Sequence, residues 1–458
     1  MRRLLATCVT AALLLTGSAV AAQAVPISPV VPAVPGTSLL SPNLTHVGTI
    51  PLDGVGVAMR VVKVGAQVRA FVSGAGGLSI YDATDPVKPL LLGHLPIYNW
   101  ENEDIAVSQD GSTAILSEFT GSFYLHVIDV SNPALPVRAG GLTLAGAHTT
   151  ECADPHCNYL FGSEGQTYDL TNRASPRQLP TAQSWGALTG AGFDGHNLHQ
   201  DAAGIWISDT NPLVVFRQTP DPLHLTVLSK GTVTLNSNYQ HNNLRPRADR
   251  FLPRTSTSGA LRDGELLLGE GESVEPTCNG GSGAFTTWSM VGFDRGVPLK
   301  QLHVLRPVTG KAFATDPAVS ALACSGHRFT QKDGADGKIL VAAAWYEHGT
   351  RLLSVDPRTG TIAQVGFFQP QRGSASQAYW MPGTDVIWTI DYHSGIDILR
   401  FDQSPRLRPT AAAVETSWLA RLHGLDAFSE ALRRLCRAGS TATTEDHARL
   451  HRATTLTG

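Results

Sequence analysis

Histidines and acidic residues stand at similar points in successive segments of the chain, directly ahead of stretches that read as β-strands. The histidines are His148, His196, His199, His241 and His327, and the nearby acids include Glu103 and Glu151. Neutral imidazoles and carboxylates are common ligands of zinc, copper and iron in proteins. The pattern therefore predicts that the five histidines bind a divalent transition metal (Zn, Cu or Fe). Glu103 or Glu151 would serve as a catalytic base or as the partner that orients a ligand.

The same histidines have a second interpretation, which the sequence leaves open. Polar side chains near the axis of a ring-shaped fold can hydrogen-bond to the backbone and to channel water without any ion. His196 and His199 are three residues apart and would point to opposite faces of a strand. One of these two is therefore expected to be structural.

An internal repeat identifies the elements that must position these side chains. Leu78-Ser-Ile-Tyr-Asp-Ala-Thr-Asp-Pro86 aligns without gaps with Leu125-His-Val-Ile-Asp-Val-Ser-Asn-Pro133, which lies 47 residues further on. Weaker copies end at Asp169, Phe216, Asp294, Asp356 and Asp402. Each copy combines an alternating strand, a turn rich in Asp, Asn, Ser and Pro, and a second strand. Seven units of about 40 to 50 residues, each with about four strands, predict an all-β, seven-bladed β-propeller.

The two ends of the repeat region are expected to complete one blade together. The phrase Val47-Gly-Thr-Ile-Pro-Leu52 resembles the last strand of a repeat but has no repeat in front of it, and the seventh copy stops without its last strand. Residues 46–52 are therefore predicted to form the outer strand of blade seven, which would leave no open sheet edge there.

The remaining segments follow from this assignment. The propeller would span residues 46–404, with a long-loop insertion at about 245–282 that is rich in Gly, Ser and Arg. A Pro-rich N-terminal segment covers residues 25–45. A short C-terminal appendix, either helical or disordered, covers residues 405–458.

The first 24 residues have the pattern of a signal peptide. Arg2 and Arg3 form a charged start, an apolar stretch follows, and Ala22-Gln-Ala24 matches a cleavage site. The sequence thus predicts a mature chain that is secreted to the extracellular or cell-envelope space. No later segment reaches 18 consecutive apolar residues, so no membrane span is expected.

Five cysteines follow the predicted cleavage site: Cys152, Cys157, Cys278, Cys324 and Cys436. In an oxidising compartment, the first four allow three disulfide pairings. We favour Cys152–Cys157, which closes a short loop, together with Cys278–Cys324. Cys436 is then left as a free thiol or an intermolecular link.

The composition narrows the range of partners. The net charge is −3 and charged residues make up 16% of the chain, so no basic field is available for nucleic acid. The 45 glycines and 28 prolines are typical of a turn-rich all-β protein. We expect a monomer whose partner is a small molecule, a polysaccharide or an extracellular protein.

Several common catalytic motifs do not apply to this sequence. Gly190-Ala-Gly-Phe-Asp-Gly195 fits the dinucleotide-binding pattern G-x-G-x-x-G, but a strand and not a helix is expected after it. The chain has no P-loop, H-E-x-x-H or G-x-S-x-G sequence. Carboxylates such as Glu270 and Glu272 could supply an acid/base pair for glycoside or lactone chemistry at a channel mouth, or could belong to a solvated loop.

The repeat phrases resemble LVIVD repeats, the motif of a family of secreted bacterial β-propellers. The resemblance covers roughly residues 46–402 and is strongest in the two copies that begin at Leu78 and Leu125. It implies a propeller fold and export, and it implies no established reaction, substrate or cofactor. A propeller with histidines near its axis is also similar to selenium-binding proteins that act as copper-dependent thiol oxidases, by analogy alone.

Two functions are compatible with these observations. The first is a metal-dependent enzyme with oxidative or hydrolytic chemistry in a channel lined by histidines and carboxylates. The alternative is a non-enzymatic extracellular scaffold that displays its loops to a protein or a polysaccharide. Imidazoles that converge on one point would favour the enzyme, and scattered imidazoles would favour the scaffold.

Overall fold

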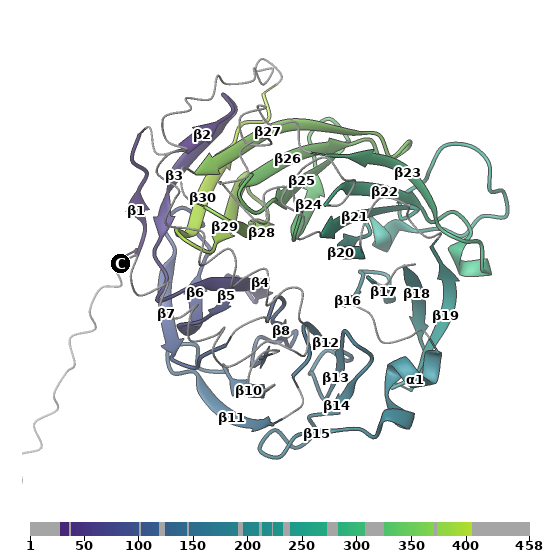
Figure 1. Cartoon of the computed structure of the whole chain (residues 1–458), viewed down its shortest axis with the longest axis horizontal. Coiled ribbons are helices and arrows are strands. Elements are labelled where there is room, and N and C mark those ends of the chain that lie inside the picture. Colours follow the sequence, from purple (N-terminus) through teal and green to yellow (C-terminus); the bar gives the residue numbers. More distant parts are fainter. Residues whose placement is uncertain are drawn as a thin grey trace, which may run out of the picture.

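Seven antiparallel β-sheets are arranged around a central axis in the computed structural model (Figure 1). The predicted all-β, seven-bladed β-propeller is therefore confirmed. The structure describes residues 28–35, 38–99, 102–118, 124–143, 146–190, 196–209, 213–221, 223–231, 239–272, 283–306, 325–370 and 373–404. The predicted signal peptide, the C-terminal appendix, Cys278, Cys324 and Cys436 lie outside these residues.

The first four blades each contain four described strands, ordered from the axis outward along the chain. Blade one contains β4 (Gly56–Val64), β5 (Gln67–Gly74), β6 (Gly77–Asp82) and β7 (Leu90–Leu95). Blade two contains β8 (Ala106–Val107), β9 (Thr113–Ser117), β10 (Leu125–Asp129) and β11 (Val137–Leu142). Blade three contains β12 (Thr150–Cys152), β13 (Tyr159–Gly162), β14 (Thr167–Asp169) and β15 (Arg177–Gln178). Blade four contains β16 (Leu198–Gln200), β17 (Ile205–Ser208), β18 (Val214–Gln218) and β19 (Leu225–Lys230).

The last three blades follow the same order, and two of them gain extra strands from the N-terminus. Blade five contains β20 (Tyr239–Leu244), β21 (Leu266–Glu272), β22 (Phe285–Ser289) and β23 (Lys300–Leu305). Blade six contains β24 (Phe329–Asp333), β25 (Ile339–Ala344), β26 (Thr350–Val355) and β27 (Ile362–Pro370), with β2 (Ser38–Leu40) outside β27. Blade seven contains β28 (Ala375–Trp380), β29 (Val386–Asp391), β30 (Gly395–Phe401) and β3 (Leu44–Ile50), with β1 (Val31–Pro32) outside β3.

Helical structure among the described residues is short. It comprises the α-helix α1 (Trp185–Thr189) and the 3-10 helices η1 (Thr181–Gln183), η2 (Ala248–Arg250) and η3 (Phe293–Arg295). In the part of the chain that the structure describes, no helix is long and apolar enough to cross a membrane.

The repeat phrase lies at the turn between the third and fourth strands of a blade. In blade one, Oδ1 of Asp82 accepts the N–H of Thr84, and Oδ1 of Asp85 accepts the N–H of Val87. In blade two the corresponding acceptors are Asp129 and Asn132, which accept the N–H groups of Ser131 and Ala134. Two successive side-chain-to-backbone turns explain why the repeat needs Asp or Asn at both positions.

Blade five departs from the predicted pattern. Its third strand is β22, and the predicted copy of the repeat at 290–294 is wrong because Phe293–Arg295 forms η3. Part of the predicted long-loop insertion is wrong as well, since Leu266–Glu272 forms the strand β21. Because the connection between β20 and β21 is long, the sequence pattern did not identify Leu266–Glu272 as the second strand of blade five.

Apolar side chains fill the space between neighbouring blades. For example, Trp388 and Ile390 of blade seven pack with Met59 and Val61 of blade one. Comparable clusters of buried side chains join each of the other neighbouring pairs of blades. Because both faces of a blade are buried, the inner strands and the residues ahead of them keep a fixed position at the axis.

The N-terminal strand β3 closes the ring beside β30, which confirms the predicted closure at slightly different bounds (Figure 1). Leu44 and Ile50 of β3 are buried. Asp397 of β30 accepts a hydrogen bond from Oγ1 of Thr49 at 2.8 Å and lies 3.1 Å from Nε2 of His46. Polar and apolar contacts therefore both join the two ends of the propeller.

A pair of buried acids near this closure makes the stability depend on pH. Burial, and then the nearby Asp397, raise the pKa of Asp391 to about 7. An unfolded aspartate loses its proton near pH 3.9. The folded state therefore holds more protons between about pH 4 and pH 7, so the free energy of unfolding falls as the pH rises through this window.

Asp391→Asn is expected to remove this dependence and to stabilise the protein at pH 8 by on the order of 2–4 kcal/mol. The amide oxygen can still accept the N–H groups of His393 and Ser394. Urea unfolding at pH 5 and pH 8 measures the effect, with the exposed Asp402→Asn as the control. An equal stability change at both pH values would contradict the prediction.

Candidate metal centre

The inner strands bring four of the five predicted histidines to one point on the axis. His148, His196 and His327 lie just ahead of β12, β16 and β24, and His241 lies within β20. Their rings follow one another in blade order. The ring centroids of His148 and His196 are 3.9 Å apart, those of His196 and His241 4.2 Å, and those of His241 and His327 4.1 Å.

The carboxylate of Glu103, from the segment ahead of β8, lies at the centre of these rings. Its Oε2 is 3.2 Å from Nε2 of His148, 3.1 Å from Nε2 of His196 and 2.8 Å from Nε2 of His241. Its Oε1 is 3.0 Å from Nε2 of His327. Five side chains from five blades therefore direct their nitrogen and oxygen atoms at one small volume.

The backbone orients two of the imidazoles. Nδ1 of His241 donates to the carbonyl oxygen of His327 at 2.8 Å, and Nδ1 of His327 donates to that of Ser376 at 2.6 Å. Because a carbonyl oxygen can only accept, each Nδ1 carries a proton, and each ring has a lone pair at Nε2 whenever it is neutral. Metal-binding histidines commonly have this outer hydrogen bond.

Burial keeps most of the imidazoles neutral. Burial, and then His148, lower the pKa of His196 to about 3. Burial, and then the neighbouring imidazoles, hold the pKa of His241 well below its ordinary value. For His327, burial lowers the pKa, but Glu103 and Glu272 outweigh that effect and raise it.

Glu103 is the anionic group among these rings. Burial raises the pKa of Glu103, but the four imidazoles, led by His327, outweigh this effect and hold the pKa well below its ordinary value. The centre thus combines an ionised carboxylate with imidazoles that differ in their tendency to hold a proton, which is raised for His327 and lowered for His196 and His241.

The spacing of these atoms fits a transition metal ion. Two ligands at right angles, each about 2.1 Å from an ion, are about 3.0 Å apart. The distances of 2.8–3.2 Å between the Glu103 oxygens and the four Nε2 atoms match that separation. Glu103, His196 and His241 form one group of atoms that could hold an ion, and His241, Glu272 and His327 form another.

Glu272, the last residue of β21, adds a second carboxylate. Its Oε2 lies 3.7 Å from Nε2 of His241 and 3.9 Å from Nε2 of His196. Its Oε1 accepts a hydrogen bond from the Tyr346 hydroxyl at 2.6 Å. The sequence suggested Glu272 only as part of an acid/base pair, because its strand had been assigned to a long loop.

A chain of charged side chains extends from the centre toward solvent. Nε of Arg328 is 3.8 Å from Glu103, and its Nη1 is 3.3 Å from Asp104. Arg60 lies 3.6 Å from Asp104 and donates to both Glu151 oxygens at 2.9 and 3.0 Å. The Arg60 side chain is 29% exposed, against 2% for Arg328. Neither arginine belongs to a sequence motif that would have predicted its place near the centre.

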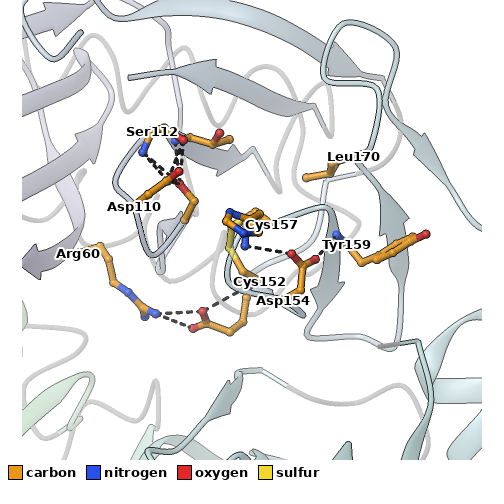
Figure 2. The surroundings of a disulfide bond; sticks show 12 residues. Arg60, Asp110, Ser112, Cys152, Asp154, Cys157, Tyr159 and Leu170 are labelled. Atoms are coloured by element: carbon orange, nitrogen blue, oxygen red, sulfur yellow. Dashed lines mark hydrogen bonds and ion pairs between the residues drawn. A yellow bond between two sulfur atoms is a disulfide. The ribbon is translucent and has the colours of Figure 1, made fainter. Parts of the chain in front are cut away.

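Glu151 lies in this chain of ion pairs, where its carboxylate contacts Arg60. Figure 2 shows the Arg60 guanidinium reaching toward the strand that carries Cys152, which directly follows Glu151 in the sequence. The predicted Cys152–Cys157 disulfide is present and closes the loop beside this contact. Glu151 is therefore a partner of Arg60, and among the described residues it has no contact with an imidazole that would support a role as base.

His199 does not join the four converging imidazoles. It is buried, and neither of its ring nitrogens has a hydrogen-bond partner in the part of the chain that the structure describes. Burial, and then Arg60 and Arg328, lower its pKa to about 3. No contact joins His199 to Glu103 or to another imidazole among the described residues, so His199 is left out of the proposed ligands below.

Comparison with known proteins supports the fold alone. No family model matches the chain, and no curated protein sequence matches it. Among solved structures, the β-propeller domain of Cps50 (Swd1) from Myceliophteria thermophila is similar, with a TM-score of 0.51, 10% identity, and coverage of 77% of this chain and 98% of that chain. A putative 6-phosphogluconolactonase from Bacteroides uniformis has a TM-score of 0.52, 13% identity, and coverage of 75% of this chain and 95% of that chain.

The fold and the site together define a class: a seven-bladed β-propeller whose axis carries histidine and carboxylate groups that could hold a metal ion.

Proposed function

We propose that this protein is an exported propeller of the LVIVD type that binds one divalent transition metal ion at its axis. The ligands are the Nε2 atoms of the four converging histidines, His148, His196, His241 and His327, together with Glu103. The observation that carries the proposal is the convergence of four Nε2 atoms on one buried carboxylate at 2.8–3.2 Å.

A bound ion would supply Lewis-acid or redox chemistry, and with it the oxidative or hydrolytic activity of an enzyme. The chain's own residues bind and orient it. The backbone carbonyls of His327 and Ser376 fix two imidazoles, and burial excludes bulk water from His241 and His327. Such pre-orientation is the usual requirement of a functional metal site.

Export is part of the proposal, and two features support it. The N-terminus has a charged start, an apolar stretch and an A-x-A site. Cys152 and Cys157 form a disulfide, a bond that persists mainly in oxidising compartments. The Asp- and Asn-based turns of blades one and two support the LVIVD resemblance.

The metal content of the mature protein tests the proposal. The protein is purified natively without a histidine tag, reconstituted with Zn²⁺, Cu²⁺ or Fe²⁺, and measured by elemental analysis. About one ion per chain is expected in the wild type and almost none in a variant with His148, His241 and His327 changed to alanine. A control variant changes the exposed His94, His156 and His224 to alanine and should keep its metal.

Two results would contradict the proposal. If the wild type stays metal-free after reconstitution, the imidazoles are structural and the non-enzymatic extracellular scaffold becomes the better interpretation. If the axial variant keeps as much metal as the surface variant, any bound ion lies elsewhere.

A further inference from the structure

Glu272 faces the candidate centre in a different way from Glu103. Oxygens of Glu103 lie within 3.2 Å of all four Nε2 atoms. Oε2 of Glu272 stands at 3.7 and 3.9 Å from the Nε2 atoms of His241 and His196. Glu272 also belongs to a group of atoms that could hold an ion, together with His241 and His327.

Tyr346 holds the other oxygen of Glu272. Its hydroxyl donates to Oε1 at 2.6 Å, and its ring lies against that of His327 with centroids 4.9 Å apart. Tyr346 is fully buried, so the hydrogen bond does not compete with bulk water. The carboxylate can then turn only its Oε2 toward the imidazoles.

The backbone at Tyr346 is unusual and is held in place by its neighbours. Its φ of 32° lies in the left-handed region, which a residue with a side chain rarely adopts. The carbonyl of Tyr346 accepts the N–H groups of Gly349 and Ala375 at 2.8 and 2.9 Å. Such conformations persist where the surroundings enforce them, and they cluster at functional sites.

The geometry points to Glu272 as a sixth ligand of the ion, positioned by the hydrogen bond that it accepts from Tyr346. This inference rests on the proposed function, because it needs an ion on the four imidazoles and Glu103. Six nitrogen and oxygen donors suit an ion that accepts octahedral coordination, whereas structural zinc sites are usually four-coordinate.

Azide, the probe anion used below, would bind to the ion at the position that Oε2 of Glu272 would otherwise occupy. An electron pair of the azide would form that bond, and the carboxylate would keep its own electron pair. Nothing is oxidised or reduced, and no proton moves. Glu103 would remain bound because its oxygens contact all four imidazoles.

The test uses the full mature protein loaded with Co²⁺, whose visible absorption strengthens as the coordination number falls, and inorganic azide as the probe anion. Three variants are compared with the wild type: Glu272→Gln, Tyr346→Phe and the control Tyr168→Phe. Tyr168 is a fully buried tyrosine of blade three. Circular dichroism and the unfolding midpoint identify any variant that does not fold.

Weak visible absorption, typical of six-coordinate Co²⁺, is expected for the wild type. Stronger absorption is expected for Glu272→Gln, in which Co²⁺ has one ligand fewer. Azide should bind Glu272→Gln roughly 10-fold more tightly than the wild type. Tyr346→Phe should shift both readouts in the same direction by a smaller amount, and Tyr168→Phe should match the wild type.

Three outcomes would count against the inference. If Co²⁺ binds and Glu272→Gln leaves the spectrum and the azide affinity unchanged, Glu272 is no ligand and the proposed metal site still stands. If Tyr346→Phe has no effect or weakens azide binding, its positioning role is wrong. If the wild type binds no Co²⁺, the proposed function and this inference fail together.

Discussion

Glu103→Gln is expected to lower the affinity of the candidate centre for Co²⁺ or Zn²⁺ by at least roughly 100-fold. The substitution keeps the size of the side chain but removes the negative charge that four imidazole Nε2 atoms surround at 2.8–3.2 Å. It also replaces one carboxylate oxygen with an amide nitrogen, which has no lone pair for a metal ion. Calorimetric titration of the metal-free protein measures the loss.

Glu151→Gln is the matched control for this prediction. Glu151 is also a buried channel carboxylate, but its described partner is Arg60. The control is expected to change metal affinity by less than about 10-fold. Equal losses in the two variants would mean that general channel charge, and not coordination by Glu103, determines the affinity.

Deletion of the closing strand is expected to have the largest effect on stability. A chain that starts at Asp53 lacks β3, whose residues pair with β30 from Leu44↔Phe401 to Ile50↔Ile396. The deletion removes two buried apolar side chains, each worth roughly 2–3 kcal/mol, and leaves the outer edge of β30 unpaired, since its other edge still pairs with β29. We expect a loss of at least about 5 kcal/mol, or of the cooperative transition itself.

A chain that starts at Leu44 is the control, since it loses β1 and β2 but keeps β3. It should unfold cooperatively, with a midpoint in urea much closer to that of the full chain. If both truncated chains were equally stable, the closure by β3 would contribute little, and the contacts between blade faces alone would hold the ring together.

The fold could be predicted because its signal is repeated along the chain. The turn phrase recurs in blade after blade, and one such phrase near the N-terminus without a repeat identified the closing strand. Equivalent positions ahead of the inner strands meet at the axis, so the convergence of His148, His196 and His327 follows from the repeat. The strands of blade five were harder to predict, because a long connection separates β20 from β21 and interrupts the spacing of the repeat.

The rest of the candidate site could not be predicted, because it depends on side-chain direction and on contacts between distant blades. Arg328 follows His327 directly but extends to Asp104 of blade two. Tyr346 lies in a turn between β25 and β26, and only the folded turn brings its hydroxyl to Glu272. His199 lies within the inner strand β16, and among the described residues neither of its ring nitrogens has a hydrogen-bond partner.

The closure by β3 also determines the order in which the propeller can be completed. Thr49 and Asp397, which meet across this closure, are 348 residues apart in the chain. Each of blades one to five can form from a continuous stretch as it is synthesised, but β3 must wait for β30, the last described strand. Contacts of such long range slow folding, and partly folded chains with an unpaired strand are prone to associate with one another. We therefore expect blade seven to form last, and a chain released before Phe401 to remain an open ring.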